Sequence, residues 1–361
     1  MSGTSSTSST SDVSSTSDMS GISSARSASG TASAPATNGA PTAGTATDRR
    51  GILHGLPWLV WHRHRTALRA GLLITIVACA LFVYQRMQVM DFLNAKGASP
   101  DSEGNLLNEF QNRFGSTFSG DLDFLKLVPV LVGVFLGAPL ISSEQEHGTI
   151  KLVTTQSAGR GRWITATLGL PLALAALCTT LLTAAFSWLW SPAHELAMSG
   201  DWLNNGAFEV VGPVPVAITL FMTACGIGIG MLVKRVVTAM AATAALALVA
   251  SMVWSEQVRG RLGTLRSVTY PYNGEVPDLP PGSVRVDDWV ATADGKLFGF
   301  GTCTHADADA CRAKLGIVNR VIQYFDYGQM AGMQWLGAGI LLALTAVVLA
   351  FVVWRARRRP L

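Results

Sequence analysis

Few residues of this sequence could perform catalytic chemistry, and they do not complete the patterns that the chemistry needs. His194 and Glu195 begin an H-E-x-x-H zinc-protease motif, but Met198 stands where the second histidine should be. That second imidazole is required as a zinc ligand on the same helix face. The sequence also contains no G-x-S-x-G nucleophile turn and no G-x-x-x-x-G-K-[ST] phosphate-binding loop. We therefore predict that the chain is no enzyme and that any ATP hydrolysis belongs to another chain.

A second segment whose residues could do chemistry is CTHADADAC, in which Cys303 and Cys311 flank His305, Asp307 and Asp309. The spans described next place this segment outside the membrane, where the environment is oxidising and disulfides persist. We expect a Cys303–Cys311 disulfide, worth roughly 2–3 kcal/mol for so small a ring. A metal site that also uses the histidine and the two aspartates is the alternative.

The composition places most of the chain in a membrane. Of its 361 residues, 49% are hydrophobic and 14% are charged, and the mean hydropathy is +0.35, whereas soluble domains carry about 25% charged residues. A membrane-spanning helix needs about 20 apolar residues. Six stretches reach or approach that length: Ala70–Gln85, Leu127–Ser143, Trp163–Trp190, Gly212–Val233, Val236–Trp254 and Gly328–Trp354. We predict an all-α polytopic membrane protein with six transmembrane helices, of which the first two are short.

The charges predict the orientation of these helices. With six spans both termini share one side, which carries 15 Lys and Arg against 5 Asp and Glu, while the other side carries 12 against 18. Basic residues favour the cytoplasm, so we expect both termini there. The basic balance is thus a topology signal, and no nucleic-acid partner is expected.

The chain before the first span divides into two parts. Residues 1–48 consist mostly of Ser, Thr, Ala and Gly, a composition that cannot bury enough apolar surface to offset the entropy of ordering. We expect a disordered cytoplasmic tail there. Residues 49–69 combine Trp58 and Trp61 with Arg63, a mixture suited to a helix in the headgroup region. We expect an interfacial helix, followed by the first five spans in residues 70–254.

Residues 255–327 are too many for a plain connection between two spans. Asp294-Gly295 lies between alternating β-branched and aromatic residues, which predicts a β-hairpin. Apolar residues at helical spacing predict an amphipathic helix over Ala308–Tyr324. We therefore expect a small α+β extracellular cap, with the sixth span and a basic cytoplasmic tail in residues 328–361.

One polar segment, ISSEQEHGTIKLVTTQSAGRGRWI, interrupts the apolar runs from Ile141 to Ile164. On the predicted topology residues 142–162 form the cytoplasmic loop between the second and third spans. We expect the second helix to continue until Glu144 and Glu146 emerge into water, and Gly148 permits a break after them. An apolar centre rimmed by charge is what a partner protein would contact. A turn that only fixes the topology is the alternative.

The spans show no energy source of their own. None of the predicted spans holds an ionisable residue near its middle, where such residues usually mark proton relays or ion paths. Two G-x-x-x-G pairs, Gly133–Gly137 and Gly226–Gly230, would allow close helix approach. Glycine is frequent in membrane helices generally, so these pairs alone do not identify a contact.

The polar segment resembles the loop between the second and third spans in permease subunits of ABC-2-type ABC transporters, particularly actinobacterial ones. The resemblance rests on the pattern Glu-x-x-x-Gly-Thr from Glu144 to Thr149, an apolar turn, and Arg-x-Arg-Trp from Arg160 to Trp163. After Trp163 the chain departs from the family, since ITATL replaces a frequent basic residue. In that family the loop is a coupling helix that docks into a separate ATPase subunit. The coupling residues that the resemblance implies are Glu144, Glu146, His147, Gly148, Thr149, Arg160 and Arg162.

The resemblance implies a membrane-spanning permease subunit of an ATP-driven transporter in a bacterial plasma membrane. Because members of the family are usually exporters, it also implies export. The partners it implies are an ABC ATPase that binds the ATP and Mg²⁺, a second permease subunit and the lipid bilayer. No cofactor or metal is expected in this chain. A non-transporting membrane sensor or anchor, with a ligand-binding outer cap, is the alternative function. An intramembrane enzyme is a further alternative, which the missing motifs disfavour.

Overall fold

The computed structural model describes residues 56–96, 103–146, 160–197, 201–304 and 307–358. Side chains are described throughout these ranges except in residues 56–64, 96, 103–105 and 160–167. The predicted disordered tail, residues 1–48, lies outside the described residues.

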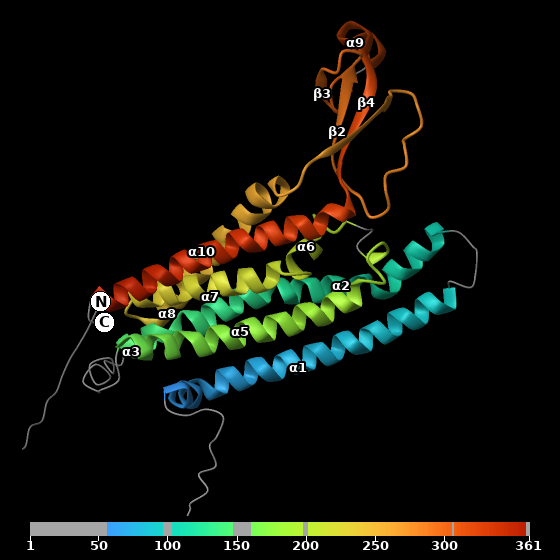
Figure 1. Cartoon of the computed structure of the whole chain (residues 1–361). Coiled ribbons are helices and arrows are strands. Elements are labelled where there is room, and N and C mark those ends of the chain that lie inside the picture. The colour runs from blue at the N-terminus through green and yellow to red at the C-terminus, as the bar shows by residue number, and fades with distance from the viewer. Residues whose placement is uncertain (1–55, 97–102, 147–159, 198–200, 305–306, 359–361) are drawn as a thin grey trace, which may run out of the picture. The chain divides into compact units, whose positions relative to one another are not determined.

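Within the described residues, six helices are long and apolar enough to cross a membrane, by length and composition, which agrees with the predicted number. They cover Arg65–Ala95, Leu106–Glu146, Leu168–Trp190, Val214–Leu232, Val236–Arg261 and Tyr327–Arg358. In Figure 1 these helices lie side by side, and a small β-sheet stands at one end of the bundle. We call this end the sheet end and the opposite end, where α3 (Pro139–Glu146) lies, the α3 end.

The spans are built from the following elements. The first is α1 (Leu56–Lys96), the second is α2 (Glu103–Val132) with the π-helical turn η1 (Gly133–Gly137) and α3, and the third is α5 (Arg160–Trp190). The short α6 (Ala207–Val210) precedes the fourth span, α7 (Val214–Leu232). The fifth is α8 (Val236–Val253) with η3 (Trp254–Val258) and η4 (Arg259–Arg261), and the sixth is η5 (Tyr327–Gln329) with α10 (Met330–Arg358).

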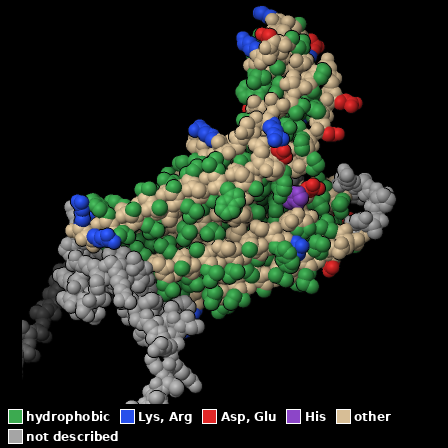
Figure 2. Space-filling view, in the orientation of Figure 1, with side chains coloured by type: hydrophobic (Ala, Val, Ile, Leu, Met, Phe, Trp, Pro, Cys, Tyr) green, Lys and Arg blue, Asp and Glu red, His purple; other side chains and the backbone are tan. Residues whose placement is uncertain are grey.

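The lateral surface of the bundle is apolar. Figure 2 shows hydrophobic side chains along the helices, with charged side chains gathered toward the two ends and on the sheet. Among the exposed residues are Val237 and Met252 of α8, at 78% and 69%, and Val347 of α10, at 66%. Soluble monomers rarely expose apolar patches of this extent. A belt of apolar side chains around a helix bundle is suited to contact with lipid chains.

The helix α7 lies at the centre of the bundle. Of its most apolar 18 residues, 72% are buried within the protein, compared with 17–44% in the other five spans. It contacts α2, η1, α3, α5, α8 and α10. A helix that is hydrophobic all round is expected in such a position, because no face of it meets water.

The helices α1 and α2 are longer than the predicted spans Ala70–Gln85 and Leu127–Ser143. The former has 41 residues, and the latter already begins at Glu103, so much of the connection between the two predicted spans is helical. The reason is a stripe of buried apolar side chains at helical spacing, which interspersed charges conceal in the sequence. The stripe consists of Phe110, Phe114, Phe118, Leu122 and Leu125.

This stripe packs against α1 and α5 in an aromatic cluster. The ring of Phe114 meets Phe92 of α1 edge-on, with centroids 5.5 Å apart. The ring of Phe118 lies 6.5 Å from Phe186 of α5, which in turn lies 5.5 Å from Phe82 of α1. Such pairs contribute about 0.5–1.5 kcal/mol beyond their buried area. The cluster therefore joins the sheet-end halves of these three helices.

The expected interfacial helix, residues 49–69, is not separated from the first span. The helix α1 runs without a break from Leu56 to Lys96. Pro57 falls in its first turn, where the missing N–H removes no helical hydrogen bond. The side chains of this segment up to His64 lie outside the described ones, so its location in the headgroup region stays a prediction.

The sheet has four antiparallel strands in the order β1-β4-β2-β3. They are β1 (Arg266–Pro271), β2 (Val284–Thr292), β3 (Leu297–Gly299) and β4 (Ile317–Phe325), and α9 (Ala308–Leu315) accompanies them. The predicted hairpin is confirmed. It joins β2 to β3, with Gly295 at φ +86° and the N–H of Thr292 donating to the carbonyl of Lys296 at 3.1 Å.

The predicted amphipathic helix Ala308–Tyr324 is wrong in its second half. The helix α9 ends at Leu315, and Gly316 follows in the left-handed conformation at φ +68°. The residues after it, IVNRVIQYF, are rich in β-branched and aromatic side chains that favour a strand. They form β4, which pairs with β1 on one side and with β2 on the other. Pairing along both edges therefore outweighs the helical spacing of the apolar residues.

Gly316→Ala is predicted to destabilise the sheet by about 1–2 kcal/mol, because an L-residue pays that cost in the left-handed conformation. The nearest atom to an added Cβ would be Thr292 Cγ2 at 3.8 Å, so the effect would come from the backbone and not from a clash. Limited proteolysis of the purified chain should show faster cleavage within residues 266–325. Gly299→Ala is the control, since it has open space and no positive φ. Equal protection of the two variants would contradict the prediction.

Candidate functional site

The structure describes only part of the predicted coupling residues. Glu144 and Glu146 end α3 and have described side chains. His147, Gly148 and Thr149 lie outside the described residues, so the break at the glycine stays a prediction. Arg160 and Arg162 belong to the first turn of α5, but their side chains are not among those described.

Glu144 does not emerge into water, contrary to our expectation. Its exposed fraction is 5%, and Ser142 one half-turn earlier is fully buried. The helix α3 packs on α7 and α8, and because residues two positions apart point to different sides of a helix, the protein covers more than one side of α3. The sequence could not show this, because polar residues after an apolar run normally mark the place where a helix leaves the membrane.

The two residues that follow connect α3 to the turn between α7 and α8. The amide of Gln145 donates to the carbonyl of Met231 in the last turn of α7 at 3.2 Å. The carboxylate of Glu146 accepts from the N–H of Val236, the first residue of α8, at 2.9 Å. Backbone groups at helix ends have no partner within their own helix, and a carboxylate at a helix N-terminus also interacts favourably with the helix dipole. The polar segment therefore begins by capping two other helices.

The two G-x-x-x-G pairs meet one another in the structure. A Cβ on Gly226 would lie 2.4 Å from the carbonyl oxygen of Gly133, and one on Gly230 would lie 2.3 Å from that of Ala138. From the other side, a Cβ on Gly137 would lie 2.7 Å from the carbonyl oxygen of Thr223. These distances are too short for real side chains, so the backbones of α7 and η1 are in direct contact. Packing of this kind is what small residues allow in membrane helices.

The π-helical turn η1 lies at this contact and has a local cause. Pro139 has no N–H and its ring would collide with the carbonyl of Phe135 in a continuous α-helix. The chain instead widens for one turn, and the N–H of Ala138 donates to the carbonyl of Gly133, five residues earlier, at 3.0 Å. Such π-turns occur frequently at functional sites. Here it carries α3 against α7 immediately before the capping residues.

At the sheet end, the segment around α6 binds three other parts of the protein. The ammonium of Lys126 in α2 donates to the carbonyl of Asn205 at 3.2 Å. Gln334 of α10 is buried, and its amide donates to the carbonyls of Phe208 and Val211 at 3.2 and 2.8 Å. The indole N–H of Trp202 donates to the carbonyl of Gly282 beside the sheet at 2.9 Å. The segment is therefore a junction of α2, α10 and the sheet region.

An ion pair connects the same segment to the fifth span. Arg259 Nη1 lies 3.1 Å from Glu209 Oε1, and the two side chains are only 14% and 15% exposed. Burial raises the pKa of the Glu209 carboxyl, and the positive charges of Arg259 and Lys126 oppose that rise. The carboxylate thus depends on its two basic neighbours to stay charged in a partly buried position.

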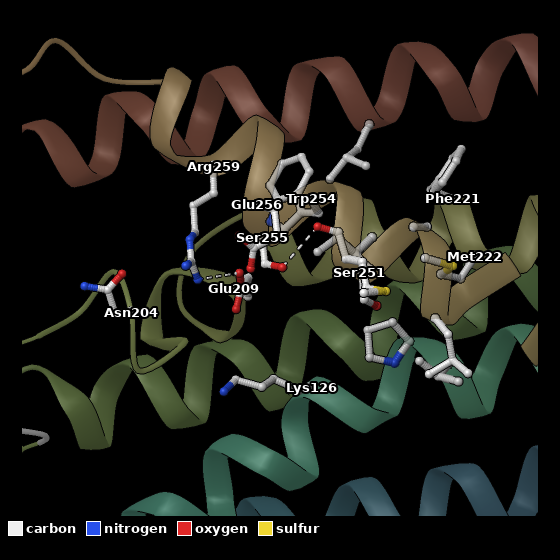
Figure 3. A pocket seen from close by; sticks show the side chains of 17 residues that line it. Lys126, Asn204, Glu209, Phe221, Met222, Ser251, Trp254, Ser255, Glu256 and Arg259 are labelled. Atoms are coloured by element: carbon white, nitrogen blue, oxygen red, sulfur yellow. Dashed lines mark hydrogen bonds and ion pairs between the residues drawn. The ribbon is translucent and has the colours of Figure 1, made fainter. Parts of the chain in front are cut away.

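Beside this ion pair lies a cleft of about 560 Å³, which we call the lateral cleft. Figure 3 shows its polar residues Lys126, Glu209 and Arg259 toward one end, with Phe221 and Met222 at the other. Its walls come from α2, α7, α10 and the fifth span. The volume lies within the range of about 300–1,000 Å³ that is usual for ligand sites. The cleft combines a charged end with an apolar end and so fits a molecule of the same character.

Sequence reasoning missed the residues that build this region. Gln334 and Arg259 stand at the ends of apolar runs. Polar residues are common at such positions, so nothing in the sequence indicated a role for them. None of the predicted spans holds an ionisable residue near its middle, but the second span is longer in the structure, and its range Leu106–Glu146 includes Asp121 and Lys126. The one available signal was the pair of opposite charges, Glu209 and Arg259, close to the two ends of neighbouring spans.

The predicted disulfide is confirmed. Cys303 and Cys311 are bonded, with their Cα atoms 5.6 Å apart, and they tie the start of α9 to the end of the hairpin. Their thiols are therefore not free for the alternative metal site, and His305 lies outside the described residues. Within the described parts of the chain, no three His, Cys, Asp or Glu side chains are grouped as metal ligands. His194 stacks on the ring of Tyr327 at 4.7 Å, where it supports the base of the sheet region.

Gly230→Ala is predicted to destabilise the bundle by about 1–3 kcal/mol, the usual cost of overpacking. The added Cβ would meet the backbone of Ala138, which cannot move aside as a flexible side chain would. Thermal unfolding of the protein in detergent would measure the effect. Gly228→Ala is the matched control in the same helix, because its Cβ would meet Val348 at an ordinary 3.7 Å. A similar loss in both variants would contradict the account of the glycine contact.

Glu209→Ala is predicted to destabilise the protein by about 3–5 kcal/mol, because it leaves the largely buried guanidinium of Arg259 without its partner. Adding Arg259→Leu should restore much of the stability, since the double variant no longer buries an unpaired charge. Melting temperatures of the two single variants and the double variant form the test. Strictly additive losses would show that the two side chains do not depend on each other.

Comparison with protein-family models gives one match to the described helices. A family described as ABC-2 membrane transporter related matches residues 72–259, just over half of the chain. The match begins in α1 and ends in η4, so it includes the glycine contact, Gln145 and Glu146, and both partners of the ion pair. Comparison with curated proteins and with solved structures gives no match. The chain belongs to the ABC-2 membrane transporter related family.

Proposed function

We propose that this protein is the permease subunit of an ATP-driven ABC transporter and that a separate ATPase chain supplies its energy. The ATPase docks on the loop of residues 142–162, binds the ATP and Mg²⁺ itself, and moves the helices through that loop. This assignment goes beyond family membership, which establishes a membrane transporter component. It is supported by the way in which the start of the loop is bound to the bundle.

The observation that carries the proposal is the double capping by Gln145 and Glu146. The first side chain binds the end of α7 and the second binds the start of α8. A force applied to the loop after Glu146 therefore acts on the second, fourth and fifth spans together. If α3 were bound to its own helix alone, the same force could bend α2 without moving its neighbours.

The glycine contact makes this connection stiff. At Gly226 and Gly230 the backbone of α7 touches the backbone of η1 and Ala138, so no flexible side chain lies between them to absorb a displacement. ATP can shift a conformational equilibrium only through contacts that differ between the two states. A docking loop joined rigidly to three spans gives the ATPase such a contact.

The orientation and the remaining partners follow from the charges and the family. Both termini are proposed to face the cytoplasm of a bacterial plasma membrane, because the basic residues favour that side. The last turns of α10 carry Arg355, Arg357 and Arg358, and they lie at the α3 end where the ATPase would dock. A second permease subunit, identical or not, completes the transporter, and export is the proposed direction.

The docking half of the proposal is tested by changing the apolar centre of the loop. Ile150→Asp with Leu152→Asp should abolish retention of the ATPase, because a charged pair cannot replace apolar contacts at a protein interface. The readout is affinity purification from native membranes followed by an ATPase assay. Ser157→Ala, a small change in the same loop, is the control. Unchanged ATPase retention by the aspartate variant would contradict docking at this loop.

The transmission half is tested separately by Glu146→Ala. Loss of an N-terminal cap costs about 0.5–2 kcal/mol, so the protein should fold and still retain the ATPase. ATP hydrolysis should then continue while coupled transport or substrate-stimulated hydrolysis falls. Glu146→Gln, which keeps an acceptor for the N–H of Val236, should retain most of the coupling. Equal coupling in the alanine variant and the native protein would contradict the proposed route.

The alternative function, a non-transporting membrane sensor or anchor, predicts a different outcome of the same purification. Such a protein would leave native membranes without any ATPase, whichever variant is used. The outer sheet would then be the part that binds a ligand. Native protein that never retains an ATPase would support this alternative and contradict the permease proposal.

A further inference from the structure

The lateral cleft changes in character along its length. Its apolar part is lined by Val130, Ile218, Phe221, Met222, Leu248 and Leu341. Its polar part includes Arg259, which lies eleven residues after Leu248 on the fifth span, or about 16 Å along a helix axis. Figure 3 shows the charged side chains toward one side and Phe221 and Met222 toward the other. The cleft therefore combines a polar part and an apolar part, which is the pattern that an amphiphile matches.

Four charged side chains line the polar part, two of each sign. Glu209 forms an ion pair with Arg259 at 3.1 Å, and the charge of Lys126 acts on the same carboxylate from beyond ion-pair distance. Lys126 and Glu256 then remain, and among the described residues neither is in an ion pair within 4 Å. Among the described residues, Lys126 donates to one backbone carbonyl, that of Asn205. One positive and one negative group are thus available to a ligand.

These two groups belong to different walls of the cleft. Lys126 comes from α2, whereas Glu256 comes from η3 of the fifth span. Figure 3 labels Lys126 beside the ribbon of α2 and Glu256 on the ribbon of the fifth span. Both residues are exposed, so a headgroup could reach them without breaking a buried contact.

We propose that the lateral cleft binds an amphiphile with a zwitterionic headgroup and an apolar chain. Lys126 holds the anionic part of the headgroup, Glu256 holds the cationic part, and the chain lies along Phe221, Met222 and Leu248. Binding does not depend on the role of the protein in transport. That the bound amphiphile is transported rests on the proposed function.

The charge pattern disfavours a headgroup of one sign. A purely anionic headgroup would pair with Lys126 but would lie near the carboxylate of Glu256, and a purely cationic one would meet the opposite conflict. A headgroup whose two charges each face an opposite charge of the cleft is favoured, because a headgroup of one sign would bring like charges together and be repelled. A headgroup without a chain would leave the apolar part of the cleft in contact with water, so it should bind weakly.

The test compares probes that have the same chain and different headgroups. Dodecylphosphocholine, dodecyl phosphate and dodecyltrimethylammonium are titrated below their micellar concentrations against the full-length protein in a maltoside detergent. Binding is followed by the rise in melting temperature. The zwitterionic probe should bind about tenfold more tightly than either of the others, as expected when one charged contact is lost. Phosphocholine without a chain should give no shift, which separates an amphiphile site from a site for a soluble ion.

Two variants should move the preference in opposite directions. Lys126→Met keeps a long unbranched side chain and should favour the cationic probe, whereas Glu256→Gln should favour the anionic probe. Leu248→Trp fills the apolar part and should weaken all three probes, and Glu195→Gln, which is outside the cleft and 61% exposed, should change nothing. Equal affinities in the native protein, or a ranking that neither charge variant alters, would overturn the proposal. Retention of the ATPase is measured in a separate experiment, so failure of the amphiphile proposal can be distinguished from failure of the proposed function.

Discussion

The structure depends on one backbone contact, in which α7 lies against the π-helical turn η1. Glycines stand on both sides of this contact, so no side chains keep the two backbones apart. They are Gly226 and Gly230 in α7 and Gly133 and Gly137 in η1. In a membrane, where lipid is as apolar as the helices, close packing of this kind is the main source of helix association. The contact places α7 at the centre of the bundle, and the other spans are arranged around it.

Both ends of this central helix are held by polar contacts, with backbone caps at one end and an ion pair at the other. At the α3 end, Gln145 and Glu146 bind the turn between α7 and α8 through backbone groups. At the sheet end, Lys126 and Arg259 bind the segment around α6 from α2 and from the fifth span, on either side of the lateral cleft. Widening the cleft at that end requires that one of these two contacts break. The contacts at the α3 end thus join three spans to one another, and those at the sheet end hold two walls of the cleft to the same segment.

The sequence predicted the parts of the fold that rest on composition and local turns. The six spans, the disulfide and the hairpin at Asp294-Gly295 are confirmed, because apolar runs, paired cysteines and turn residues act locally. The extended α2 and the strand β4 were missed, since a buried stripe among charges and pairing along two strand edges depend on distant partners. The sequence indicated that the glycine pairs permit close helix packing but not which helices they join, because only the fold shows that the two pairs face each other. The burial of Glu144 and the capping by Glu146 likewise depend on α8, which is 90 residues away in the chain.

The central claim is that α3, α7 and α8 move together when the ATPase acts, while the cleft changes its width. Spin labels at two pairs of exposed positions, with the free cysteines replaced, test it by distance measurements in the complex with and without ATP. The first pair, Phe135 in η1 and Val237 in α8, reports on the α3 end, and the second, Asp123 in α2 and Gln257 in η3, spans the cleft. The account predicts an unchanged distance for the first pair and a shifted distance for the second. A nucleotide-dependent shift between Phe135 and Val237 with a fixed cleft would contradict it.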